Sequence, residues 1–151
     1  MLENYEINID TLAILPIEEN ISKVYESETE YIVKQNCNKI IEDNCKFYGS
    51  SYKGRCEGTR FLTGIKSKCP IIIDESRDMI FFPTGSTRNE KNCWIALNKV
   101  KEYNKTIFGC YITFMNDFSL PLDISLYSID NQYYRATMLK SKFNDKKNFK
   151  N

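Results

Sequence analysis

Alternating apolar and polar positions dominate the first third of the chain. The alternation across residues 5–14 predicts extended structure that ends at Pro16. Residues 23–26 and 30–34 are predicted as two short strands around the polar turn 27–29. The chain therefore opens with strands.

The spacing then changes to that of helices. Residues 36–48 are predicted as an amphipathic helix, with Asn36 as N-cap and Gly49 just past its end. Ser50-Ser51 can cap a second, shorter helix that ends at Gly64. The apolar positions of the first helix are Cys37, Ile40, Ile41, Cys45 and Tyr48.

Short β-rich runs follow, and helical spacing returns near the end of the chain. Predicted strands cover residues 71–73, 79–82, 93–100, 111–115 and 118–122, with turns at 74–78, 83–86 and 116–117. A closing helix begins at Leu126 and carries its apolar face as far as Phe143. The Lys-rich tail 144–151 is predicted to be frayed.

These elements predict one α+β domain at residues 1–143, with a central antiparallel sheet, two short helices after the N-terminal strands and a closing C-terminal helix. A chain of 151 residues can bury a core without metals or disulfides. The acidic start does not resemble a signal peptide, and no apolar stretch is long enough to span a membrane. The sequence therefore predicts a cytoplasmic protein.

The net charge of +1 conceals an asymmetry along the chain. Residues 1–34 carry a net charge of −6, and the remainder carries +7. Residues 46–68 hold six basic groups against Glu57 alone, and residues 135–150 hold six against Asp145. Local basic excess suits a polyanionic partner, although two solvated basic surfaces would give the same pattern.

The spacing of the six cysteines does not match that of a metal site. They contain no Cys-x-x-Cys pair, and the chain has no histidine, so closely paired zinc ligands are missing. In a reducing compartment such cysteines serve as small buried apolar residues. We therefore expect reduced thiols and no metal or other cofactor.

The sequence also lacks the residues and motifs of common enzyme classes. Without histidine, the commonest general base is missing, and no nucleotide-binding or nucleophile-elbow glycine motif occurs. Asp74, Glu75 and Asp78 could bind Mg²⁺ in a nuclease-like site. Acidic residues in a hairpin turn are more often solvated turn residues, so the nuclease is the weaker alternative.

Residues 47–59 combine hydroxyls, a helix start, basic side chains and two glycines. The amides at the helix start and the Ser50 and Ser51 hydroxyls could bind phosphate. Gly54 and Gly58 share a helix face, so a DNA strand could approach closely there. The same two glycines would equally permit tight helix packing inside the fold.

Several motifs together resemble those of the ComK competence transcription factor family. They appear in the family's order and span roughly residues 5–145. The motifs are Ala13-Ile14-Leu15-Pro16, Phe47 to Thr59, Phe82-Pro83-Thr84 with Ser86-Thr87-Arg88, Cys93-Trp94-Ile95, and Asn131-Gln132-Tyr133-Tyr134-Arg135 with Lys142-Phe143.

The resemblance implies a transcription activator of genes for DNA uptake, including its own. Family members bind paired AT-rich boxes, mainly through the minor groove, as dimers that assemble in pairs. RNA polymerase and an adaptor that delivers the factor to a Clp protease are the implied protein partners. A relative that binds AT-rich DNA without activating transcription is the alternative within this class.

Charge and motif position together predict the DNA contacts. They are Ser50, Ser51, Tyr52, Lys53, Arg55, Arg60, Lys66, Lys68, Arg88 and Arg135. Two departures from the family stand out. The acidic start offers no contact surface for DNA, and the chain stops soon after the closing helix, whereas longer relatives continue. The adaptor interaction is therefore expected to differ here.

Overall fold

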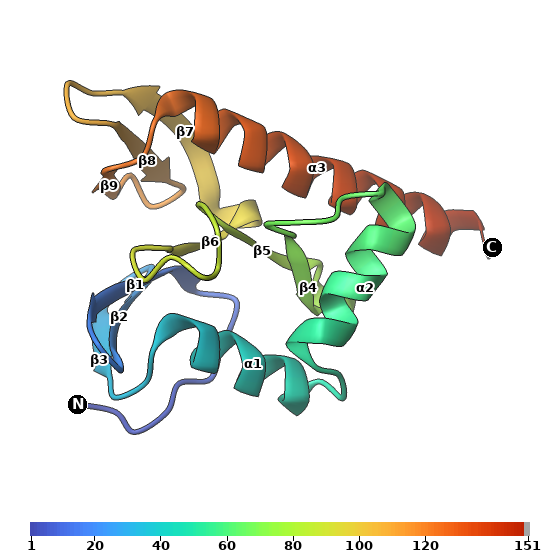
Figure 1. The fold of residues 1–151 in the computed structure, drawn as a ribbon, viewed down its shortest axis with the longest axis horizontal. Helices are drawn as coiled ribbons and strands as arrows, with labels where there is room; N and C mark the ends of the chain where they lie inside the picture. The colour runs from blue at the N-terminus through green and yellow to red at the C-terminus, as the bar shows by residue number, and fades with distance from the viewer. Residues whose placement is uncertain (150–151) are drawn as a thin grey trace.

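The computed structural model describes residues 1–149, which form two antiparallel sheets and three helices (Figure 1). The larger sheet has the strand order β3-β2-β1-β6-β5-β4, with β1 at Thr11–Glu18, β2 at Ile21–Glu26, β3 at Glu30–Val33, β4 at Ile71–Asp74, β5 at Met79–Pro83 and β6 at Trp94–Ala96. The smaller sheet has the order β7-β8-β9, with β7 at Val100–Lys105, β8 at Cys110–Phe114 and β9 at Ser119–Leu122.

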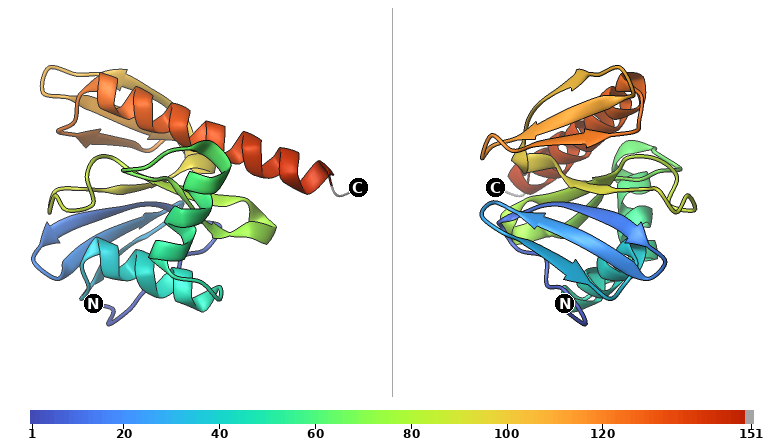
Figure 2. Two further views of the ribbon diagram at one scale, coloured as in Figure 1. Left: turned by 45° about the vertical axis from the view of Figure 1, so that its right-hand side comes forward. Right: turned by 90° about the vertical axis from the view of Figure 1, so that its left-hand side faces the viewer.

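The helices are α1 (Cys37–Phe47), α2 (Tyr52–Thr63) and α3 (Leu126–Phe149), and short 3₁₀ turns occupy Glu75–Arg77 (η1) and Leu97–Lys99 (η2). Their order confirms the predicted α+β domain, with two helices after the N-terminal strands and one at the end. Helix α1 lies on one side of the larger sheet, and α3 lies on the other side with the smaller sheet (Figures 1 and 2).

Strands β6, β5 and β4, which form one end of the larger sheet, are buried on both faces. Alternate side chains of each strand point to opposite faces, so each strand contributes to both core layers. Toward α1 lie Ile71, Ile73, Phe81, Trp94 and Ala96. Toward α3 and the smaller sheet lie Ile72, Ile80, Phe82 and Ile95. This double burial explains why these strands read as continuous apolar runs.

The predicted helix ends are confirmed by their caps. The Asn36 side chain accepts a hydrogen bond from the Lys39 amide at 2.8 Å, and Gly49 follows α1 at a φ of 80°. Gly64 ends α2 in the left-handed conformation, with the same φ of 80°. Both glycines occupy a backbone region that other residues rarely adopt.

The single strand predicted at 93–100 is wrong. The chain leaves the larger sheet after Ala96, makes the η2 turn and enters the smaller sheet at Val100. Leu97 and Val100 stay buried through the turn, so the apolar pattern continues although the strand does not. Strand β7 then runs to Lys105, past the predicted end, because its exposed polar residues pair with β8.

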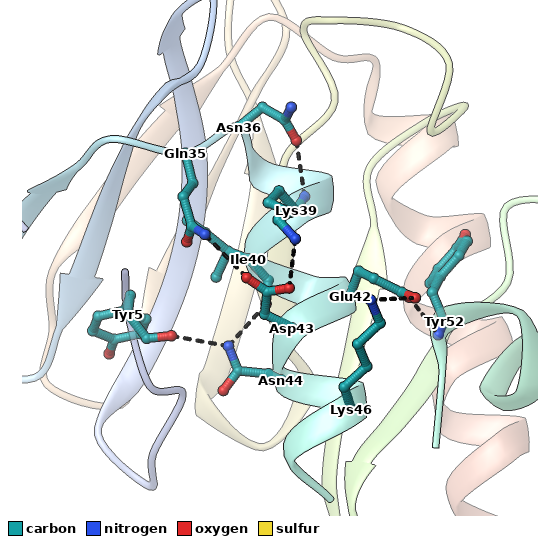
Figure 3. A network of polar contacts seen from close by, with 10 residues as sticks. All are labelled: Tyr5, Gln35, Asn36, Lys39, Ile40, Glu42, Asp43, Asn44, Lys46 and Tyr52. Atoms are coloured by element: carbon teal, nitrogen blue, oxygen red, sulfur yellow. Dashed lines mark hydrogen bonds and ion pairs between the residues drawn. The ribbon is translucent and has the colours of Figure 1, made fainter. Parts of the chain in front are cut away.

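The structure of both chain ends also differs from the elements predicted there. Tyr5 and Ile7 lie outside the strands, and the Ile7 amide donates to the Asn44 side chain of α1. The Asn44 side chain in turn donates to the Tyr5 carbonyl oxygen (Figure 3). Strand β1 continues through Pro16, although proline has no amide hydrogen to donate. Pro16 lies beyond the part of β1 that pairs with β6, so no hydrogen bond to β6 is lost there. Helix α3 continues past Phe143 into the segment predicted as a tail, and residues 150–151 lie outside the described residues.

Candidate nucleic-acid interface

The start of α2 is held by side chains of the protein itself. Ser51 accepts a hydrogen bond from the Gly54 amide at 2.9 Å. The Glu42 carboxylate of α1 accepts one from the Tyr52 amide at 2.6 Å (Figure 3). The expectation of free amides for a phosphate is therefore wrong at Tyr52 and Gly54, because the Glu42 carboxylate and the Ser51 hydroxyl already accept from these amides.

Tyr52 and Ser50, two further residues predicted to contact DNA, pack within the fold at this helix start. The Tyr52 ring packs edge-on against Trp94, with ring centroids 5.9 Å apart, and burial raises the pKa of its hydroxyl. Ser50 lies half-buried, with its hydroxyl 3.5 Å from the Ser51 carbonyl oxygen. These side chains fix where α2 begins.

The two glycines of α2 lie in different surroundings. A Cβ atom at Gly54 would come within 2.9 Å of the Ser50 hydroxyl and 3.2 Å of the Ser51 hydroxyl. At Gly58, a Cβ atom would meet no described atom within 4 Å. Gly54 therefore makes room for the Ser50 hydroxyl and the capping Ser51 hydroxyl, whereas Gly58 faces open space on an exposed helix face.

Arg55 belongs to the interior side of α2. Its side chain is only 14 % exposed, and it forms an ion pair with Glu75 in the η1 turn at 2.7 Å. Its Nε atom is buried and has no hydrogen-bond partner among the described residues. Arg55 therefore ties α2 to the β4–β5 hairpin, and its charge is already paired.

The other basic residues gather around the segment that follows α2. Gln132 of α3 donates to the Lys68 carbonyl oxygen at 2.9 Å, and Arg135 donates to the Ser67 carbonyl oxygen at 3.0 Å. Arg60 of α2 lies 3.5 Å from the Lys66 carbonyl oxygen. These contacts hold residues 65–69 between α2 and α3. Lys66 and Lys68, whose side chains are exposed, therefore lie on a segment that two arginines contact through its backbone.

Helical spacing extends this group of charges in both directions. Lys53 precedes Arg60 by seven residues, so both lie on the exposed face of α2. Lys142 follows Arg135 by seven residues on α3 and is also exposed. We call this set the α2–α3 basic surface: Lys53, Arg60, Lys66, Lys68, Arg135 and Lys142. Lys142 is not among the predicted contacts, although the i, i+7 spacing on the predicted helix places it in line with Arg135.

Arg88 lies apart from the basic surface. Its neighbour Thr87 accepts a hydrogen bond from the Asn38 side chain at 2.8 Å. Asn38 also accepts from the Trp94 indole at 3.2 Å, and Tyr52 packs against that ring. The exposed Arg88 therefore lies near the starts of α1 and α2. Arg60 lies at the opposite end of α2, roughly 12 Å along the helix axis from Tyr52.

The three carboxylates of the alternative nuclease site point to separate partners. Asp74 caps the η1 turn by accepting from the Ser76 amide at 3.0 Å. Glu75 pairs with Arg55 at 2.7 Å, and Asp78 pairs with Lys147 at 3.0 Å. Across residues 1–149, no group of three or more acidic or cysteine side chains has an arrangement that could hold a metal ion.

No helix in the described part of the chain combines the length and the apolar character that a membrane crossing requires. Although α3 has 24 residues, charged side chains are spread along it.

Comparison with known proteins confirms the family resemblance that the motifs indicate. The family model described as "ComK protein" matches residues 2–148. The chain is 39% identical over 149 residues to the competence transcription factor of Bacillus subtilis (strain 168), a match that covers 96% of this chain and 78% of that protein. No solved structure matches. The chain belongs to the ComK family.

Proposed function

We propose that this protein is a competence transcription regulator that binds AT-rich duplex DNA through the α2–α3 basic surface. The observation that carries the proposal is the meeting of Arg60, Lys66 and Lys68 with Arg135, which is distant in the sequence. Residues 46–68 contain Glu57 as their one acid, so little negative charge offsets this group. The similarity to the competence transcription factor of Bacillus subtilis supports the regulatory role.

The chemistry of the surface suits the backbone and the minor groove of DNA. Lysines neutralise phosphates and release counterions, which gives affinity without sequence preference. Arginines are favoured in the narrow, strongly negative minor groove of AT-rich DNA. Arg60 and Arg135 are the two arginines of the surface, and we assign them to that groove. The lysines then position the duplex.

The test is a titration of AT-rich and GC-rich duplexes at several salt concentrations. The double variant Lys66→Ala with Lys68→Ala should bind more weakly, and its log K against log salt slope should fall by about 2, because two phosphate contacts are lost. Its matched control is Lys34→Ala with Lys105→Ala, which removes the same charge from exposed sites outside the surface. Equal loss in both variants would show that net charge alone drives binding.

Groove preference is tested with competitors. A ligand that fills the AT minor groove should displace the protein, whereas a bulky major-groove modification should leave the affinity unchanged. Equal affinity for GC-rich and AT-rich duplexes at moderate salt would contradict minor-groove recognition.

Activation, as distinct from binding, is the second half of the proposal. We infer that dimers assemble in pairs on paired AT-rich boxes and that the bound protein recruits RNA polymerase. Footprinting on the protein's own promoter, combined with transcription in vitro, separates an activator from a relative that only binds. A footprint without an increase in transcript would support the non-activating alternative.

A further inference from the structure

Four tyrosines line an open groove between β7 and the N-terminal half of α3 (Figure 1). Tyr103 of β7 lies against Tyr133 of α3, with ring centroids 5.3 Å apart, and its hydroxyl donates to Asp130 at 2.6 Å. The Tyr133 ring also packs edge-on against the buried Phe82. These contacts anchor one wall of the groove to the core. The groove has a volume of about 360 Å³ and is lined by Tyr103, Tyr127, Asp130, Asn131, Tyr133 and Tyr134.

The other two tyrosines of the groove are largely exposed. Tyr127 is 81 % exposed and Tyr134 is 66 % exposed. They are seven residues apart, so they lie on one outward face of α3 together with Asn131, which is also exposed. Burial in the core does not explain these two rings. Large aromatic side chains left in water beside a groove are typical of a surface that binds a partner.

The charges along this part of α3 suit an anionic chain. Residues 131–143 contain three basic residues and no acid, and the basic residues are Arg135, Lys140 and Lys142. Arg135 follows the exposed Tyr134 directly, so a basic group adjoins the aromatic face. A phosphate beside Arg135 would leave the neighbouring base within reach of the tyrosine ring. The groove therefore fits a ligand that carries both phosphates and flat rings.

Asp130 is the one acid that lines the groove, and it narrows the choice of ligand. Its Oδ1 atom accepts from the Tyr103 hydroxyl, and because the residue is exposed, its Oδ2 atom can accept from a donor on a ligand. Adenine and cytosine carry such a donor in their exocyclic amino groups. A carboxylate repels a bare phosphate but forms a hydrogen bond with a base. The base, and not the phosphate, is therefore expected inside the groove.

We propose that this groove binds unpaired bases of single-stranded DNA, an activity separate from the binding of duplex DNA. Sites for single strands combine basic groups along the backbone with aromatic rings on which bases stack, and every base has a face that can stack. Here Tyr127 and Tyr134 stack on bases, Asp130 accepts from a base amino group, and Arg135 binds a phosphate. In a duplex the base faces are covered by their neighbours, so the groove selects bases that have left the stack. Arg135 also belongs to the α2–α3 basic surface, but the groove does not depend on the function proposed for that surface.

The test measures the affinity of the full chain for three labelled ligands by fluorescence anisotropy. They are an oligo(dA) strand, an abasic strand of the same length, which keeps the phosphates but lacks the bases, and an AT-rich duplex. Oligo(dA) should bind more tightly than the abasic strand, by roughly 5- to 150-fold for each stacked base. Equal affinity for the two strands would show that the protein binds phosphates alone, which would overturn the proposal.

Variants of the exposed tyrosines locate the site. Tyr127→Ala and Tyr134→Ala should each weaken binding of oligo(dA) by roughly 5- to 150-fold and leave the abasic strand and the duplex unaffected. Tyr134→Phe keeps the ring and should bind oligo(dA) normally. The matched control is Phe47→Ala, which removes an aromatic ring that is also 66 % exposed from the end of α1 and should change none of the affinities. Thermal melts establish that each variant is folded.

The remaining outcomes separate this site from other uses of the same groove. Asp130→Asn should reduce the preference for oligo(dA) over the abasic strand, because the base loses its acceptor. An equal loss of duplex and oligo(dA) binding in Tyr134→Ala would place the ring in the duplex surface and reject the proposal. Unchanged oligo(dA) binding with a loss of self-association in sedimentation would make the groove a contact between copies, which also rejects it. Absent duplex binding with the oligo(dA) preference intact would instead reject the proposed function and leave this inference standing.

Discussion

Helices α1 and α2 follow each other in the chain, have similar lengths and use similar caps, yet they are buried very differently. Helix α1 buries five of its 11 residues, whereas α2 buries Thr59 alone among 12. The exposed face of α2 includes Gly58 and Phe61, the latter 82 % exposed. Core packing therefore explains the sequence of α1 but leaves most of α2 unexplained, which is typical of an element that meets a partner.

The largest expected effect is on stability and concerns α1, the more deeply buried of the two helices. Ile41 of α1 is completely buried, so Ile41→Ala should lower the free energy of unfolding by about 2–5 kcal/mol. Phe61→Ala on the exposed face of α2 should change it by less than about 0.5 kcal/mol. Urea denaturation of both variants measures the contrast. Similar losses in the two would show that α2 packs more tightly than its exposure indicates.

The next effect separates the two arginines of α2. Arg60→Ala should weaken binding to AT-rich DNA by roughly 1–3 kcal/mol while leaving the melting temperature nearly unchanged, because its side chain is exposed. Titrations and melts of the same sample test this. Normal binding by a normally folded Arg60→Ala protein would place the DNA surface elsewhere.

Arg55→Ala should show the opposite profile. Its removal loses the packing of a nearly buried stem and the ion pair with the exposed Glu75, which together contribute about 1 kcal/mol of stability. DNA affinity per folded molecule should be retained. Replacing both arginines together would mix a structural and a functional loss, so the single variants are the informative ones. A loss of affinity without a loss of stability in Arg55→Ala would reverse the assignment.

The sequence predicted the parts of this fold that depend on neighbouring residues. Caps such as Asn36 and the polar turn between β8 and β9, where Asp117 has a φ of 69°, are local features. The η2 turn was missed because a strand that changes sheets keeps its apolar pattern. Local signals cannot reveal such a change of partner.

The candidate site shows the same limit more sharply. Charge identified a basic segment, and the structure brings Arg60 and Arg135 to one surface beside it. The sequence could not show that Glu42 caps α2 or that Glu75 forms an ion pair with Arg55, because both contacts join residues from different elements. Long-range pairing decides which basic residues stay available to a polyanion.

The smallest predicted effect is the one that tests the open face of α2 most directly. Glycine inside a helix costs about 0.5–1 kcal/mol relative to alanine, and Gly58 has free space around the position of a Cβ atom. Gly58→Ala should therefore stabilise the protein by that amount in urea denaturation. If the DNA backbone approaches this face closely, the added methyl group should at the same time weaken binding to AT-rich duplex.

The matched control is Gly54→Ala, where the added Cβ atom would lie 2.9 Å from the Ser50 hydroxyl and 3.2 Å from the capping Ser51 hydroxyl. Disturbing the cap costs about 1 kcal/mol, which offsets the gain from alanine. A gain in stability at Gly58 without one at Gly54 would show that Gly54 is required by the fold and that Gly58 is tolerated despite its cost. A Gly58→Ala protein that gains stability and keeps full affinity would remove Gly58 from the DNA contact. The contact would then be confined to Arg60 and the segment that follows α2.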